Sequence, residues 1–338
     1  MGPTSPAPMP SSPLRGAPSR AGSPVSAGLP SGIPSGAPAG APPLPPGSAA
    51  PPGRFRRDPR LAAAYDTELA PLWTQPFGRL LVAQLAGELG EQLGHLRRAT
   101  ILDVMCHTGD PALELVRRLP EARVFAVDPS SAMLDVARKK SGPYLSRRIF
   151  FRTEPVEPRL PFDESMADLV ISNLGLHDVE QPPRLLREMA RVAKPGARIL
   201  ATLPLRGTFA EFYALVENEL RDEPHKAARL QAHLRGWPDA ATVRAWAEAA
   251  GLQDLEVAVE PFTLLFAGGA DLFFAPVIEY GPLVGWKGLL GDSLAEMQAR
   301  FVALRDAIDR LCEGKDRGGP RRPFALTVRA ACLRARCE

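Results

Sequence analysis

The sequence predicts a doubly wound α/β fold with a mostly parallel sheet, and three observations carry this prediction. Short β-rich runs alternate with helical segments of about ten residues or more, the pattern of right-handed βαβ crossovers. The runs are apolar on both faces, as strands buried between two helical layers should be. Two helix starts carry proline in the first turn, at Pro111 and Pro129, where a missing N–H costs no hydrogen bond.

Seven runs are expected to form strands of one sheet. In order these are TILDVM (100–105), RVFAVD (123–128), RIFFRT (148–153), DLVISNL (168–174), RILATLPL (198–205), LEVAVEPFTLLF (255–266) and FALTVRAACLRARC (324–337). Between the fourth and fifth, residues 181–193 place their apolar side chains on one helical face, and Lys194-Pro195-Gly196 then ends that helix.

The chain is expected to divide into five segments. These are a disordered tail (1–53), a helical lead-in (54–98), a ligand-binding core (99–205), a helical cap with an intervening strand (206–313) and the final strand (322–338). We expect the cap to cover the carboxyl ends of the strands, where a doubly wound sheet builds its substrate pocket.

Composition limits the cellular compartment and the classes of partner that we expect for this protein. About 16 of the 37 prolines lie in the first 53 residues, which contain no acidic residue and too little apolar surface to fold. Neither a secretory signal nor a membrane-spanning run is visible, so we expect a soluble, cytoplasmic protein that contacts no membrane. The 4 cysteines show no zinc-ligand spacing, and a net charge of +3 with dispersed arginines argues against nucleic-acid binding.

Candidate ligand-binding residues follow the first two strands. Asp103 lies near the end of the first strand, Gly109 lies at the entrance of the next helix, and Asp128 ends the second strand. In a doubly wound sheet a carboxylate at the place of Asp128 can accept hydrogen bonds from both hydroxyls of a ribose. Helix capping by Asp128 and loop anchoring by Asp103 are the structural alternatives.

From Leu61 to the C-terminus, the chain resembles class I S-adenosylmethionine-dependent methyltransferases, which have a Rossmann-like sheet of seven strands. The stretches ILDVMCHTGDPALEL, VFAVDPSSAML and ADLVISNLGLHDVEQPPRLLREMARVAKPGARILATL carry the resemblance. The layout is similar to methyltransferases of type 11 and to the malonyl-carrier-protein methyltransferase. S-adenosylmethionine is therefore the implied cofactor, and the implied cofactor-binding residues are Asp103, Met105, His107, Gly109, Asp128, Pro129, Glu154 and Asn173.

The loop after the first strand departs from the family pattern at two positions. The family has glycines where this chain has Met105 and His107, and a side chain there must either fill part of the cofactor pocket or turn away from it. We expect both side chains to turn away, which leaves the pocket open. His107 is interpreted as a loop or pocket-lining residue rather than a catalyst, because no second metal ligand accompanies it.

His177, just beyond the fourth strand, is the candidate catalytic base, with pocket lining as its alternative role. Tyr213, Trp237 and Tyr280 are expected to lie in the core of the cap rather than in a substrate pocket.

The predicted function is methyl transfer from S-adenosylmethionine to a small molecule or a carrier-bound acid. The alternative is a catalytically inactive methyltransferase-fold protein that binds a protein partner, for which the proline-rich tail offers a contact segment. A nicotinamide-dependent oxidoreductase is disfavoured, because its three glycines would fall on Met105, His107 and Asp110.

Overall fold

The structure is a computed structural model that describes residues 59–89, 96, 98–313 and 321–338. The predicted tail (1–53) and the first residues of the predicted lead-in (54–58) lie outside the described residues.

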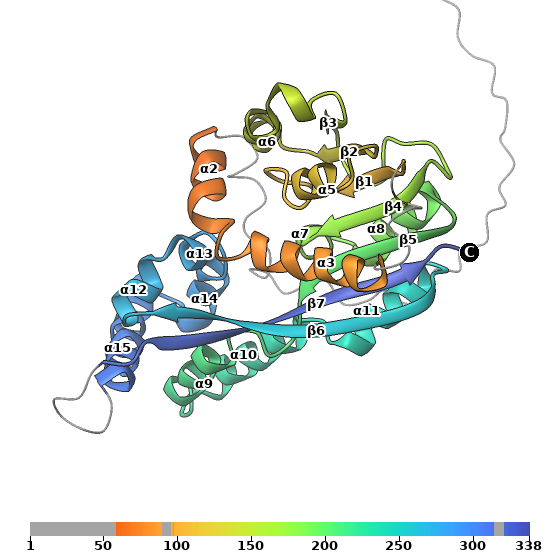
Figure 1. Cartoon of the computed structure of the whole chain (residues 1–338). Coiled ribbons are helices and arrows are strands. Elements are labelled where there is room, and N and C mark those ends of the chain that lie inside the picture. Colours follow the sequence, from red (N-terminus) through yellow and green to blue (C-terminus); the bar gives the residue numbers. More distant parts are fainter. Residues whose placement is uncertain (1–58, 90–95, 97, 314–320) are drawn as a thin grey trace, which may run out of the picture. The chain divides into compact units, whose positions relative to one another are not determined.

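A single seven-stranded sheet forms the centre of the fold, with the strand order β3-β2-β1-β4-β5-β7-β6 (Figure 1). Strands β1 to β5 pair in parallel, whereas β7 runs antiparallel to both β5 and β6. The strands are β1 (Thr100–Val104), β2 (Arg123–Asp128), β3 (Ile149–Thr153), β4 (Ala167–Asn173), β5 (Ala193–Pro204), β6 (Gln253–Phe266) and β7 (Phe324–Arg336). The predicted fold class is therefore confirmed.

Helices cover both faces of the sheet and form the cap. Before the cap lie α2 (Pro59–Ala64), the π-helix η1 (Tyr65–Leu69), α3 (Thr74–Leu89), α5 (Ala112–Arg118), α6 (Ser131–Leu145), α7 (Gly175–Asp178) and α8 (Pro182–Val192). The later helices are α9 (Ala210–Glu219), α10 (Pro224–Gly236), α11 (Ala240–Ala249), α12 (Gly269–Phe274), α13 (Pro276–Glu279), α14 (Leu283–Leu290) and α15 (Leu294–Glu313). Figure 1 shows α12 to α15 gathered at one end of the long β6–β7 ribbon.

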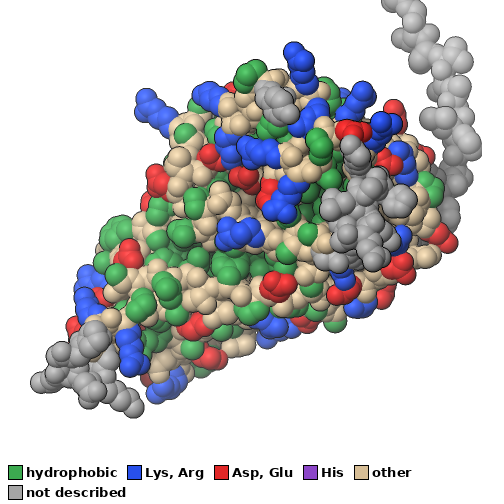
Figure 2. All heavy atoms as spheres, viewed as in Figure 1, with side chains coloured by type: hydrophobic (Ala, Val, Ile, Leu, Met, Phe, Trp, Pro, Cys, Tyr) green, Lys and Arg blue, Asp and Glu red, His purple; other side chains and the backbone are tan. Residues whose placement is uncertain are grey.

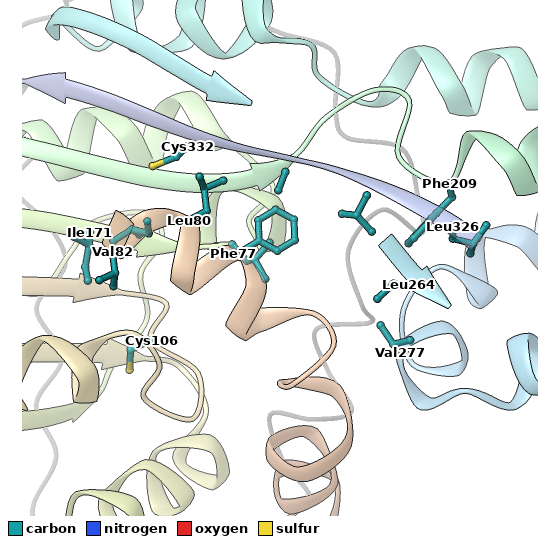
Figure 3. Packing of buried hydrophobic residues seen from close by; sticks show 14 of the residues in the cluster. Phe77, Leu80, Val82, Cys106, Ile171, Phe209, Leu264, Val277, Leu326 and Cys332 are labelled. Atoms are coloured by element: carbon teal, nitrogen blue, oxygen red, sulfur yellow. The ribbon is translucent and has the colours of Figure 1, made fainter. Parts of the chain in front are cut away.

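Two hydrophobic clusters lie on opposite faces of the sheet. One contains side chains of α3 and α5, and Figure 3 shows Leu80 of α3 near Cys332 of β7 and Val82 of α3 near Ile171 of β4. The other contains side chains of α8 and α11. Burial on both sides explains why the central strands are continuous apolar runs rather than alternating ones.

The surface carries mixed charge. Figure 2 shows Lys and Arg side chains interspersed with Asp and Glu over the face in view, without a stripe of one sign. Within the described ranges, no helix is both long enough and apolar enough to cross a membrane.

Strand order reverses between β1 and β4, which are neighbours in the sheet although β2 and β3 separate them in sequence. Doubly wound sheets bind ligands at such a reversal, in the space beyond the carboxyl ends of the two strands, which we call the β1–β4 crevice. The loop after β1 (residues 105–111) and the short helix α7 after β4 border this crevice.

Gly109 is needed for the close packing of this loop. Its φ is +97°, and an added Cβ would lie 3.1 Å from both Ala137 Cβ and Leu113 Cδ1. Gly251, with a φ of +77°, has no heavy atom within 4 Å of such a Cβ and is therefore a matched control for backbone strain alone. We expect Gly109→Ala to lower the free energy of unfolding by about 1–2 kcal/mol more than Gly251→Ala does. Urea unfolding measures both, and equal losses would contradict the tight packing at Gly109.

Candidate active site

Asp103 lies in the middle of the sheet and is fully buried. Its backbone pairs with Ala126 of β2 on one side and Ile171 of β4 on the other. Neither carboxylate oxygen has a well-formed hydrogen bond to a described residue. The carboxylate has only a weak interaction with the backbone of Ala112. Burial raises the pKa of Asp103 well above its ordinary value, the His107 ring opposes this rise, and Asp128 adds to it. An unpartnered buried acceptor of this kind fits a ligand that donates hydrogen bonds.

The loop after β1 follows the path of a glycine-rich loop even though two of its residues are not glycine. Met105, His107 and Gly109 have φ angles of 61°, 48° and 97°, all in the left-handed region. Backbone strain at two non-glycine residues persists only where the contacts around the loop stabilise this conformation by more than the strain costs.

Met105 and His107 direct their side chains differently. Met105 is 2% exposed and belongs to the hydrophobic cluster on the α8 face. It lies so close to Gly175 that a Cβ there would approach Met105 Cβ to 2.8 Å. Its burial agrees with a side chain that packs into the core. The ring of His107 reaches from the β1 loop to α7, and its turning away from the cofactor pocket stays a prediction.

His107 contacts three elements at once. Its Nε2 lies 2.8 Å from Asp178 Oδ2 in α7, its backbone N–H donates to Asp128 Oδ2 over 3.0 Å, and its ring stacks on Tyr65 at a centroid distance of 5.6 Å. Burial opposes the charged ring, but the hydrogen bond and charge of Asp178, with further help from Asp128 and Asp103, raise the pKa of His107 above its ordinary value. The imidazolium is therefore favoured by the carboxylates around it.

Asp128 ends β2 as predicted and holds the two neighbouring loops. Its Oδ2 accepts the N–H of His107, and its Oδ1 accepts the N–H of Ser130 over 2.8 Å. Ser130 in turn caps α6, because its hydroxyl accepts the N–H of Met133. In this conformation Asp128 is only 2% exposed.

The remaining predicted cofactor residues lie at the same edge of the sheet. Pro129 follows Asp128 directly, and Glu154 follows Thr153, whose Cα is the register partner of Asp128. Asn173 is fully buried and uses both ends of its amide within the fold: Nδ2 donates to the Thr74 carbonyl over 3.0 Å, and Oδ1 accepts from the Thr202 hydroxyl over 2.7 Å. Asn173 thus joins β4 to α3 and β5.

A cavity of about 50 Å³ lies beside this edge, under the cap. Its lining is mostly apolar and aromatic and consists of Tyr65, Leu69, Trp73, Leu174, His177, Asp178, Phe209, Trp237, Val277, Gly281 and Pro282. A cavity of this size holds a few water molecules, far less than the 300 Å³ or more of an ordinary ligand pocket.

His177 lies in the cavity wall, as either of its predicted roles requires. It is 4% exposed and stacks on Trp237 at a centroid distance of 5.7 Å. Burial lowers the pKa of His177, so its ring is neutral at pH 7 and able to accept a proton. Among the described residues, no three His, Cys, Asp or Glu side chains are grouped to hold a metal ion.

Sequence reasoning missed several lining residues. Tyr65 and Trp73 come from the helical lead-in, Phe209 begins the cap, and Asp178 follows His177 directly. Of the three aromatic residues expected in the cap core, Tyr213 lies there, with its hydroxyl 2.8 Å from His233 Nε2, whereas Trp237 lines the cavity. Only Asp178 carried a sequence signal, as a carboxylate next to the candidate base.

Comparisons with known proteins find a family match in the core of this chain. Residues 102–201 match the methyltransferase domain family. Over 100 residues the chain is 37% identical to the 2-phytyl-1,4-naphtoquinone methyltransferase of Nostoc punctiforme, covering 29% of this chain and 44% of that protein. Over 151 residues it is 36% identical to the malonyl-[acyl-carrier protein] O-methyltransferase of Halorhodospira halophila, covering 39% and 47%. The chain thus spans about half the length of these two relatives.

Among solved structures, the YcgJ protein from Bacillus subtilis overlaps with 75% of this chain and 99% of its own, with a TM-score of 0.47 and 17% sequence identity. The resemblance of this chain to class I S-adenosylmethionine-dependent methyltransferases is confirmed by the domain match, and S-adenosylmethionine is the cofactor of that class.

The buried acceptors fit this cofactor. S-adenosylmethionine carries an ammonium group, whose N–H donors suit the unpartnered carboxylate of Asp103. Asp128 lies at the end of β2, where the class binds the ribose.

Two carboxylates of the site are expected to respond oppositely to the same substitution. The raised pKa of Asp103 means that its favourable contribution to stability is present at acid pH and is lost as pH rises through the folded-state pKa. We therefore expect Asp103→Asn to raise the free energy of unfolding at pH 7 by about 1 kcal/mol, and by less at pH 4.

Asp128→Asn should instead lower it by about 1–2 kcal/mol, because an amide cannot accept both backbone hydrogen bonds. Chemical unfolding of both variants is the measurement. A loss of stability in Asp103→Asn at pH 7 would contradict the unpartnered state of its carboxylate.

Proposed function

We propose that this chain transfers a methyl group from S-adenosylmethionine to a small molecule that binds under the cap. The observation that carries the proposal is the buried carboxylate of Asp103, which has no well-formed hydrogen bond to a described residue and lies within the segment that matches the methyltransferase domain family. Buried charges without partners are costly and are retained mainly where a ligand uses them.

The cofactor supplies an activated methyl group on a positively charged sulfur, so the protein's share is binding, orientation and exclusion of water. Asp103 is assigned to the ammonium and Asp128 to the ribose, with Pro129 and Glu154 at the same edge. Gly109 keeps the loop close to the crevice, Met105 supports the loop from the core, and Asn173 holds the end of β4 in place.

The lining of the cavity favours a neutral aromatic acceptor over a carrier-bound acid. Four of the residues that line it, Tyr65, Trp73, Phe209 and Trp237, offer aromatic surface, and none of the lining residues is Lys or Arg. A carboxylate or phosphate would enter without a cationic partner and would meet Asp178. This agrees with the naphthoquinone named for one relative better than with the malonyl group named for the other.

His177 is assigned as the base that removes a proton from the acceptor. It lies in the cavity wall, it is neutral because of burial, and its ring is held in place by Trp237. A hydroxyl or activated carbon on the acceptor becomes a stronger nucleophile when this proton leaves.

A second candidate function is supported by the small volume of the cavity and by the His107 side chain within the glycine-type loop. In that case the chain is a methyltransferase-fold protein without catalysis, with residues 1–53 available to a protein partner. We place the protein in the cytoplasm in either case. Cofactor binding separates the two candidates.

Calorimetric titration with S-adenosylmethionine tests the first candidate. We expect saturable binding in the micromolar range, weakened at least tenfold by Asp103→Asn, because an amide loses the charge that pairs with the ammonium. The control is Asp135→Asn, an exposed carboxylate on α6 whose loss should leave the affinity unchanged. An affinity of about 1 mM or weaker, worth only about 4 kcal/mol, would exclude catalysis and favour the second candidate.

Transfer of a labelled methyl group to a panel of naphthols and to malonyl thioesters tests His177. We expect activity on the naphthols and a fall of about a hundredfold or more in His177→Gln at unchanged cofactor affinity. Because burial lowers the pKa of His177, the wild-type rate should decline with falling pH only below the ordinary histidine value of about 6.5. His225→Gln, an exposed histidine of α10, is the control. Equal rates in His177→Gln and the wild type would rule out His177 as the base.

A further inference from the structure

The side chain of His107 joins the loop after β1 to α7, the two elements that border the β1–β4 crevice. Its backbone has the left-handed conformation that favours glycine, so the imidazole side chain stands where a loop glycine would leave empty space. Asp178 of α7 holds the ring at Nε2 and Tyr65 of η1 covers one of its faces. Since α7 follows β4 and the loop follows β1, this contact connects the two sides of the crevice.

His107 contacts both the wall of the cavity and the carboxylates assigned to the cofactor. Tyr65 and Asp178 line the cavity and both contact the His107 ring, whereas Asp103 and Asp128 are not among the lining residues. On its other side, the backbone of His107 donates to Asp128, and its charge is felt by Asp103. Movement of one side chain would therefore join the cavity of about 50 Å³ to the buried acceptors.

Several ionisable groups surround the imidazole ring of His107. Asp178 of α7, Asp128 of β2 and Asp103 of β1 all favour the protonated ring, and burial alone opposes it. Tyr65 is a neutral phenol with a raised pKa, and its hydroxyl lies 2.6 Å from the Thr74 hydroxyl. The ammonium group of Lys140 on α6 pairs with Asp66 and Asp110. His107 is thus the cation that this acidic site holds in the absence of a ligand.

We propose that His107, held by Asp178 and Tyr65, is a plug in the crevice that must swing out before S-adenosylmethionine reaches Asp103 and Asp128. The proposal rests on the proposed function of the site. Because the cofactor brings its own cations to these carboxylates, the imidazolium and the cofactor compete for them. Cofactor binding therefore releases the His107 proton to the solvent, and the affinity depends on pH.

The test is the affinity for S-adenosylmethionine measured by calorimetry between pH 6 and pH 8.5 in the full chain. For each pH the dissociation constant of the wild type is divided by that of His107→Gly, which cancels the titration of the ligand's own amino group near pH 8. We expect His107→Gly to bind about tenfold or more tightly at pH 6. The ratio should fall by up to tenfold per pH unit until the raised pKa of His107 is passed.

A second variant keeps the test decisive if the loop of His107→Gly fails to fold. Asp178→Asn leaves the loop sequence unchanged but removes the charge that holds the ring, so it should also bind more tightly than the wild type at pH 6. His225→Gln, on the exposed side of α10, should reproduce the wild-type profile. Proton release is read independently from the dependence of the binding enthalpy on the ionisation enthalpy of the buffer.

The outcomes separate the plug from the function on which it rests. Binding by the variants that exceeds that of the wild type at low pH supports the plug, including the case in which only the variants bind. Equal affinities and equal pH profiles overturn the plug and leave the proposed function standing. Absence of binding in the wild type and in both folded variants overturns the proposed function and the plug together.

Discussion

The reversal of strand order between β1 and β4 is the constraint on which the site depends. Parallel neighbours whose connections leave in opposite directions cannot fill the space beyond their carboxyl ends with their own loops. Asp103 sits on one side of this crevice and Asn173 on the other, and Asn173 is tied to β5 and α3 by its amide. The ends of β1 and β4 are thus fixed by the sheet and by the Asn173 amide, and the side chains beside them shape the ligand site.

The rim combines stabilising contacts with groups that cost stability. Asp128 accepts hydrogen bonds from two backbone N–H groups, those of His107 and of Ser130 at the start of α6. It therefore holds the loop whether or not a ligand is bound. Asp103 does the opposite, because its buried carboxylate has no well-formed hydrogen bond to any residue in the described part of the chain. Met105 and His107 add backbone strain in the left-handed region. Such costs concentrate where a structure is built for binding rather than for stability alone.

Much of the fold was predictable because it depends on local pattern. The alternation of apolar runs with helical segments gave the strands to within about two residues, except that β5 begins earlier, at Ala193. Asp103, Gly109 and Asp128 were recognisable because they occupy fixed places at strand ends and a helix start. The His107 contact was not predictable, since it requires Asp178 from α7 and Tyr65 from the lead-in, which come together only in three dimensions. The partners of that side chain therefore could not be read from the loop motif alone.

Two states of the site follow from the plug proposal. Without a ligand, the His107 ring occupies the crevice. When the cofactor is bound, Asp103 accepts hydrogen bonds from its ammonium group. A crystal structure of the protein with S-adenosylhomocysteine, which keeps the ammonium but lacks the sulfonium charge, tests this most directly. The account predicts the ammonium within hydrogen-bond distance of Asp103 and the His107 ring released from Asp178. A bound ligand with the His107–Asp178 contact intact and Asp103 still without a partner would contradict it.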